Sequence, residues 1–143
     1  MRGLPKRCDL AMDGRCASAG SHSKLETSDG VTELVKWIAM WADMKLVTSQ
    51  TIFVDDFEED GVGKCVKGEW YGLSGIGMIT TSHIAVHYWP CLYYYQISVS
   101  SCKQYDHLDI VDKIENYMCC KSIMSSKLEY NPENNFYVCG RIR

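Results

Sequence analysis

The sequence lacks the features that mark membrane, exported and nucleic-acid-binding proteins. Nothing in its 143 residues approaches the ~20 consecutive apolar residues of a membrane span, and residues 1–5 show no long apolar core of a signal peptide. The net charge is -3, with neither a basic stripe nor an acidic block. We therefore expect one folded domain in the cytoplasm, with no membrane or nucleic-acid partner.

The eight cysteines include no C-x-x-C pair, the spacing that would indicate zinc or redox chemistry. Cys119 and Cys120 are adjacent, which is poor geometry for two ligands of one tetrahedral zinc. Thiols stay reduced in a protein that is not exported, so a disulfide framework is not expected either. We predict no metal site, and we expect most of the cysteines to be small buried hydrophobes.

Apolar residues recur at helical spacing in two segments. The first predicts an amphipathic helix from about Val31 to Met44, with Asp29 as its N-cap. The second predicts a helix from about Ile110 to Met118. Residues 14–30 and the acidic residues 55–68 are expected to form loops.

Alternation of apolar and polar residues instead predicts β-strands around Ile76, over 84–89 and over 93–100. Shorter candidates lie at 7–13, 51–54 and 136–139. Strands and helices are interspersed along the chain, and hairpin-like links connect neighbouring strands. This order predicts an α+β fold, a two-layer sandwich in which helices cover one face of an antiparallel sheet.

The residues that indicate chemistry lie between Gly72 and Cys102, in the run GLSGIGMITTSHIAVHYWPCLYYYQISVSSC. This run resembles the core of the pyruvoyl-dependent S-adenosylmethionine decarboxylases of bacteria and archaea, and its spacings match theirs without a gap. The matching positions are Ser74, Ser82-His83, His87, Trp89-Pro90 and Cys102.

The resemblance implies that the chain cuts itself between Thr81 and Ser82. Ser82 would attack the carbonyl of Thr81 and turn the amide into an ester. β-Elimination and hydrolysis would then leave a pyruvoyl group at the new N-terminus. His87 and Ser74 are the helpers that the resemblance implies, and histidine suits this task because its pKa lies near neutrality.

In the mature enzyme, the resemblance implies that the pyruvoyl cofactor forms a Schiff base with the substrate amine and acts as an electron sink. Cys102 would return a proton to the carbanion, since a thiol with a pKa near ~8.5 is largely protonated at neutral pH. Trp89 would stack on the adenine of S-adenosylmethionine. The product would supply aminopropyl groups for spermidine and other polyamines, and the resemblance also implies a homodimer with sites near its interface.

Strand parity places these residues on two faces. His87 and Trp89 share a face, whereas Ser82 has the opposite parity, so a break or bulge near His83 would be needed to bring Ser82 and His87 together. Ser98 and Ser100 lie on a small, polar face, which is what a sheet facing a ligand or a partner subunit needs.

Two residues depart from the family pattern. Thr81 replaces the usual Glu before the processed Ser, although it still supplies a carbonyl. Cys91 replaces the Glu that follows Trp-Pro and holds the ribose hydroxyls of the substrate, and a thiol is a weak hydrogen-bond partner. Two alternatives therefore stay open: a pyruvoyl-dependent decarboxylase of ornithine or arginine, and a non-cleaving homologue that binds a partner.

Overall fold

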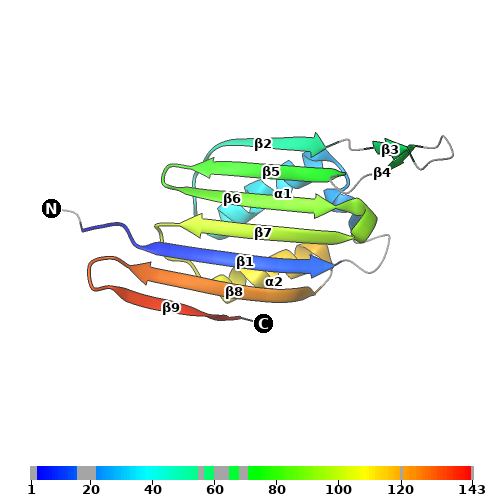
Figure 1. Cartoon of the computed structure of the whole chain (residues 1–143). Helices are drawn as coiled ribbons and strands as arrows, with labels where there is room; N and C mark the ends of the chain where they lie inside the picture. Colours follow the sequence, from blue (N-terminus) through cyan, green and yellow to red (C-terminus); the bar gives the residue numbers. More distant parts are fainter. Residues whose placement is uncertain are drawn as a thin grey trace.

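A computed structural model describes residues 3–15, 22–54, 57–59, 65–67, 71–119 and 121–142. Figure 1 shows one twisted sheet with two helices behind it, both on the same face. The prediction of an α+β two-layer sandwich is confirmed. Among the described residues, neither helix has the length and apolarity to span a bilayer.

The main sheet has seven strands in the order β2-β5-β6-β7-β1-β8-β9, and every pairing in it is antiparallel. β5, β6 and β7 form a meander in its middle, and β1 pairs with β7 on the side away from β6. The strands are β1 (Arg7–Arg15), β2 (Leu46–Val54), β5 (Gly72–Ile79), β6 (Ser82–Trp89), β7 (Tyr94–Ser101), β8 (Ser122–Asn131) and β9 (Phe136–Arg141).

Helix α1 spans Ser28–Trp41. It already includes Asp29, so the prediction of Asp29 as its N-cap is wrong. The N-cap is Thr27, whose Oγ1 accepts a hydrogen bond from the backbone N–H of Gly30 at 3.0 Å. Asp29 lies in the first turn, where its charge suits the helix dipole. Helix α2 (His107–Met118) is capped in the same way by Asp106, which accepts from the N–H of Asp109.

Glycines let α1 lie close against β5. A Cβ atom built on Gly75 would lie 2.5 Å from Cγ1 of Val31, and one on Gly77 would lie 2.5 Å from Cγ1 of Val35. The two-residue spacing puts both glycines on the helix-covered face of β5. Close approach of α1 buries the apolar row of the helix completely, which stabilises the sandwich at its centre.

The structure differs from the sequence-based expectations in three further places. The acidic segment 55–68 is not a simple loop, because β3 (Phe57–Glu59) pairs with β4 (Cys65–Lys67) within it. Strand β8, which pairs with β1, was not predicted at all. Of the four cysteines whose side chains are described, all are free; Cys8 is buried and Cys102 half-buried, whereas Cys119 and Cys139 are exposed, so the expectation of a buried thiol fails for these last two.

The face of the sheet that turns away from the helices, hereafter the open face, is not covered by any described element of this chain (Figure 1). Its polar part includes the half-buried Ser98 and Ser100 predicted for it. It also carries large apolar side chains that are 44–59% exposed, namely Ile52, Ile76, Met78, Met124 and Tyr137. An exposed patch of this kind is typical of an interaction surface.

Candidate active site

Ser82 is the first residue of β6 and points toward the helices, not toward the open face. The even-numbered residues of β6 are buried, and Ser82 itself is only 9% exposed. The register between β5 and β6 runs without a shift from Leu73↔Tyr88 to Ile79↔Ser82. The break or bulge near His83 that would be needed to bring Ser82 and His87 together is absent, and the two side chains lie on opposite faces.

The peptide bond between Thr81 and Ser82 joins an exposed turn to a buried strand. Thr81 belongs to the two-residue turn between β5 and β6. Its Oγ1 lies 2.6 Å from Sγ of Cys102, in a contact where either atom can donate. The half-buried Cys102 follows directly after β7, so the fold brings a thiol beside the bond at which cleavage is expected.

Ser101 is a site residue that sequence reasoning missed. The hydroxyl of Ser82 donates a hydrogen bond to Oγ of Ser101 at 3.0 Å, and both side chains are buried. A signal was present in the sequence: Ser101 ends the row Tyr95, Ile97 and Val99 and is the polar member of that buried face. A buried hydroxyl needs a partner, which could have directed attention to Ser101.

The segment after β7 is anchored at several points. The N–H of Lys103 donates to Oγ of Ser101 at 2.9 Å, and Nζ of Lys103 donates to the backbone oxygen and to Oδ2 of Asp43. The hydrogen bond from Lys103 lowers the pKa of the Asp43 carboxyl. The hydroxyl of Tyr105 donates to the carbonyl of Val99 at 2.9 Å, and burial raises the pKa of Tyr105 well above its ordinary value. These anchors hold Cys102 in place.

Ser74 and His87 form a second group on the open face. They face each other across β5 and β6, with Oγ of Ser74 2.8 Å from Nδ1 of His87. Both side chains line a pocket of about 240 Å³, together with Gln50, Ile52, Gly75, Ile76 and Ala85. The pocket is smaller than the roughly 300–1,000 Å³ of ordinary ligand sites. In one chain this pair stands apart from Ser82, about 16 Å along β6 at a rise of ~3.3 Å per residue.

The two residues predicted to bind substrate lie near the opposite end of β6 from Ser82. Trp89 is half-buried, with its ring 6.1 Å from that of His87 and 5.5 Å from that of Tyr94. Trp89 therefore lies next to His87 on the open face of the sheet. The side chain of Cys91 lies outside the described residues, so the structure does not test its prediction.

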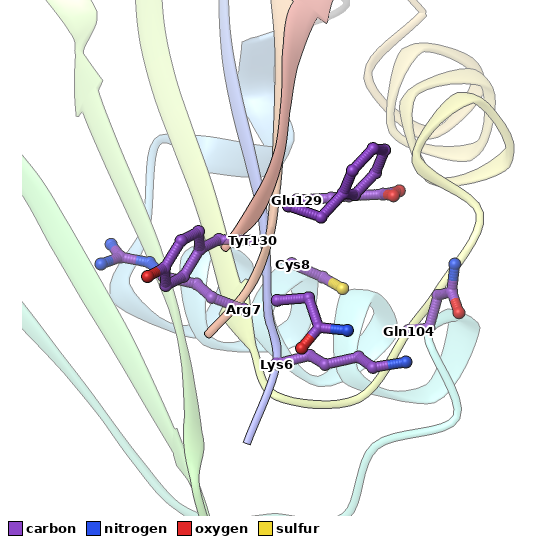
Figure 2. A pocket seen from close by; sticks show the side chains of 8 residues that line it. Lys6, Arg7, Cys8, Gln104, Glu129 and Tyr130 are labelled. Carbon is purple, nitrogen blue, oxygen red and sulfur yellow. The ribbon is translucent and has the colours of Figure 1, made fainter. Parts of the chain in front are cut away.

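Another pocket, of about 180 Å³, opens at the end of the sheet where β1 begins and β7 ends (Figure 2). Figure 2 shows Cys8 in its wall, with Lys6 and Gln104 nearby. Burial raises the pKa of the Cys8 thiol, and the charges of Glu129 and Asp9 raise it further. The lining includes neither Ser82 nor His87, and we assign this pocket no catalytic role.

No group of three or more His, Cys, Asp or Glu side chains in the described part of the chain is arranged to hold a metal ion. The groups that lie beside the Thr81–Ser82 bond are the hydroxyl of Ser101 and the thiol of Cys102. Within one chain, the Ser74–His87 pair is too distant to take part.

Comparison with known proteins identifies the family. The family model for S-adenosylmethionine decarboxylase matches residues 17–129. The crystal structure of the adenosylmethionine decarboxylase from Aquifex aeolicus VF5 has the same fold: its TM-score is 0.59 at 16% identity, over 90% of this chain and 91% of that one. A search of curated proteins finds no significant match. On the extent of the family match, this chain belongs to the S-adenosylmethionine decarboxylase family.

Proposed function

We propose that this chain is a self-processing, pyruvoyl-dependent decarboxylase that acts on S-adenosylmethionine and supplies aminopropyl groups for polyamine synthesis. Membership of the family supports the reaction type. The observation that carries the proposal is that the buried hydroxyl of Ser82 and the thiol of Cys102 both lie beside the Thr81–Ser82 peptide bond. Ser82 and Cys102 flank the Thr81–Ser82 peptide within a single anchored region.

In the proposed processing, Oγ of Ser82 attacks the carbonyl carbon of Thr81. The new C–O bond forms as the C–N bond breaks, and the hydroxyl proton ends on the freed amine. Elimination then breaks the ester and releases Thr81 as a carboxylate. Hydrolysis of the resulting dehydroalanine releases ammonia and leaves a ketone at position 82. No oxidant is needed, since water is the co-reactant.

The surroundings of Ser82 fit such a group. Residues 82–88 of β6 pair with β5 and residues 83–89 pair with β7, so a new N-terminus at position 82 stays held in the sheet. Cys102 lies beside this position. A pyruvoyl group supplies an electron sink for decarboxylation, as pyridoxal phosphate does. Sγ of Cys102 would then deliver the proton that replaces the departing carboxylate.

We further propose that the active site is shared between two copies of the chain. Ser74 and His87 cannot reach Ser82 within one chain, and their pocket is small for a nucleoside substrate. A two-fold axis across the open face would place the same patch on both copies. The Ser74–His87 pair of one protomer could then approach the exposed turn at Thr81 of its partner, while the Ser82 hydroxyl stays on the helix-covered face, and the exposed apolar side chains of the open face would be buried.

The test is the intact mass of the purified protein. The proposal predicts two fragments, the second beginning with a blocked, ketone-bearing residue 82, in place of one 16.3 kDa chain. Ser82→Ala should remain whole, whereas Ser125→Ala, a buried serine on β8, should be cut normally. A wild-type chain that stays whole and shows no reactive carbonyl would contradict the proposal and favour the non-cleaving homologue, the alternative that Thr81 and Cys91 suggest.

Cys91 motivates one further alternative, a substrate simpler than S-adenosylmethionine. Without a carboxylate at that position, discrimination for the nucleoside should weaken. Carbon dioxide release from cleaved enzyme decides between the substrates. Release from S-adenosylmethionine supports the proposal, whereas release from arginine or ornithine alone would reject it in favour of an amino-acid decarboxylase.

A further inference from the structure

The hydroxyl of Ser82 bonds to a residue that does not belong to the family motif. It donates to Oγ of Ser101, the last residue of β7, at 3.0 Å. The β6–β7 register pairs His83 with Ser100, so Ser82 and Ser101 occupy the next facing positions. They close the buried side of the sheet at the end where the proposed cleavage takes place.

Ser101 is fixed as an acceptor toward Ser82. Its Oγ also accepts the backbone N–H of Lys103 at 2.9 Å, and a hydroxyl oxygen has two acceptor positions. Lys103 is in turn held by Asp43 through two contacts of 2.7 and 2.8 Å. Ser82 and Ser101 are 9% and 3% exposed, so their contact is buried. The result is one defined orientation for the Ser82 side chain.

We propose that Ser101 is a positioning residue for self-cleavage, which holds the Ser82 hydroxyl in a single orientation beside the Thr81–Ser82 bond until the attack. This inference rests on the proposed function. It concerns the precursor only: once residue 82 has become a pyruvoyl group, it has no hydroxyl left to donate. Ser101 is therefore needed for self-cleavage of the precursor and not for turnover by the mature enzyme.

Three substitutions separate hydrogen bonding from packing. Ser101→Ala removes the acceptor and leaves a small gap. Ser101→Cys keeps the volume but offers only a weak acceptor. Ser101→Thr keeps the hydroxyl. We expect the first two to slow cleavage by about tenfold or more, because misplacement of a reacting group has effects of this size, and we expect Thr to restore a near-normal rate.

The experiment follows intact mass over time after synthesis of each variant, with Ser125→Ala as the matched control. Ser125 is also a buried serine on the helix-covered face, and its replacement should leave the rate unchanged. The fraction of Ser101→Ala that does mature is then purified and assayed. Its kcat and KM should be close to those of the wild type, which separates a role in processing from general damage to the fold.

Two results would overturn the inference. If the wild type is cut and both Ser101→Ala and Ser101→Cys are cut equally fast, then Ser101 does not position Ser82. If slow cleavage is accompanied by an equally impaired kcat in the matured fraction, the role is structural. An uncut wild type is a different outcome, since it removes the proposed function and this inference together.

Discussion

Ser82 and His87 stand five residues apart on one unbroken strand and present their side chains to opposite faces of the sheet. Ser82 is buried under the helices with Ser101, whereas His87 bonds Ser74 on the open face. Odd spacing along a regular strand imposes this separation. If His87 assists the cleavage or the decarboxylation, it must do so in a second copy of the chain.

Mixing of two inactive variants tests the shared site. Ser82→Ala lacks the nucleophile but keeps the Ser74–His87 pair, and His87→Ala has the reverse defect. We expect each alone to process slowly or not at all, and we expect co-expression to restore cut chains. Intact mass will show whether the restored fragments come from the His87→Ala chain, which alone retains Ser82.

The complementation has an internal control. Co-expression of His87→Ala with a Ser74→Ala chain should restore far less, because both variants damage the same pair. Equal recovery in both mixtures, or a protein that stays monomeric in sedimentation, would place the whole site within one chain.

Replacement of Cys102 should separate cleavage from turnover. The thiol touches Thr81 and lies beside the site of the proposed proton transfer. Cys102→Ala should still yield cut chains but lower kcat by about 100-fold, as removal of a general acid commonly does. The exposed Cys119, replaced by Ser, is the control and should leave kcat unchanged. A Cys102→Ala enzyme with normal kcat would rule out the thiol as the proton donor.

Gly75→Ala should destabilise the protein by about 1–3 kcal/mol, the usual effect of overpacking a core. The added Cβ would lie 2.5 Å from Cγ1 of Val31 and force α1 away from β5. Gly140→Ala on β9 is the matched control, since a Cβ there meets nothing within 4 Å. Urea unfolding of the two variants should differ by that amount, and equal midpoints would show that α1 adjusts without strain.

His107 should make stability depend on pH. Burial lowers its pKa below the ordinary value, although the nearby Glu129 carboxylate opposes this effect. The folded state therefore binds the proton less readily than the unfolded state, whose pKa is about 6.5. The stability that this difference contributes is therefore present above a pH of about 6.5. It is lost as the pH falls below that value, because the unfolded state then takes up a proton that the folded state binds less readily.

Replacement of His107 by Phe tests this dependence, because Phe keeps a ring against Tyr105, 4.5 Å away between centroids. The free energy of unfolding, measured in urea at pH 7 and pH 5, should fall less on acidification in His107→Phe than in the wild type. The same fall in both proteins would assign the dependence to other groups.

Local patterns in the sequence were sufficient for the fold class, for both helices and for the strands around the motif. The alternation of β6 and β7 placed His87 and Trp89 on one face and Ser82 on the other, because side-chain direction in a strand depends only on position. The motif spacing also indicated Ser74, Ser82, His87 and Cys102, and the family match bears out the family that they implied.

What only the tertiary structure decided are the contacts between residues far apart in the chain. Ser101 became the partner of Ser82, and Thr81 the partner of Cys102, because β6 and β7 pair in one particular register. Strand β8 was missed since its sequence shows little alternation, and its place is set by pairing with β1. Propensity and periodicity act over a few neighbouring residues, whereas register and burial depend on the whole packed chain.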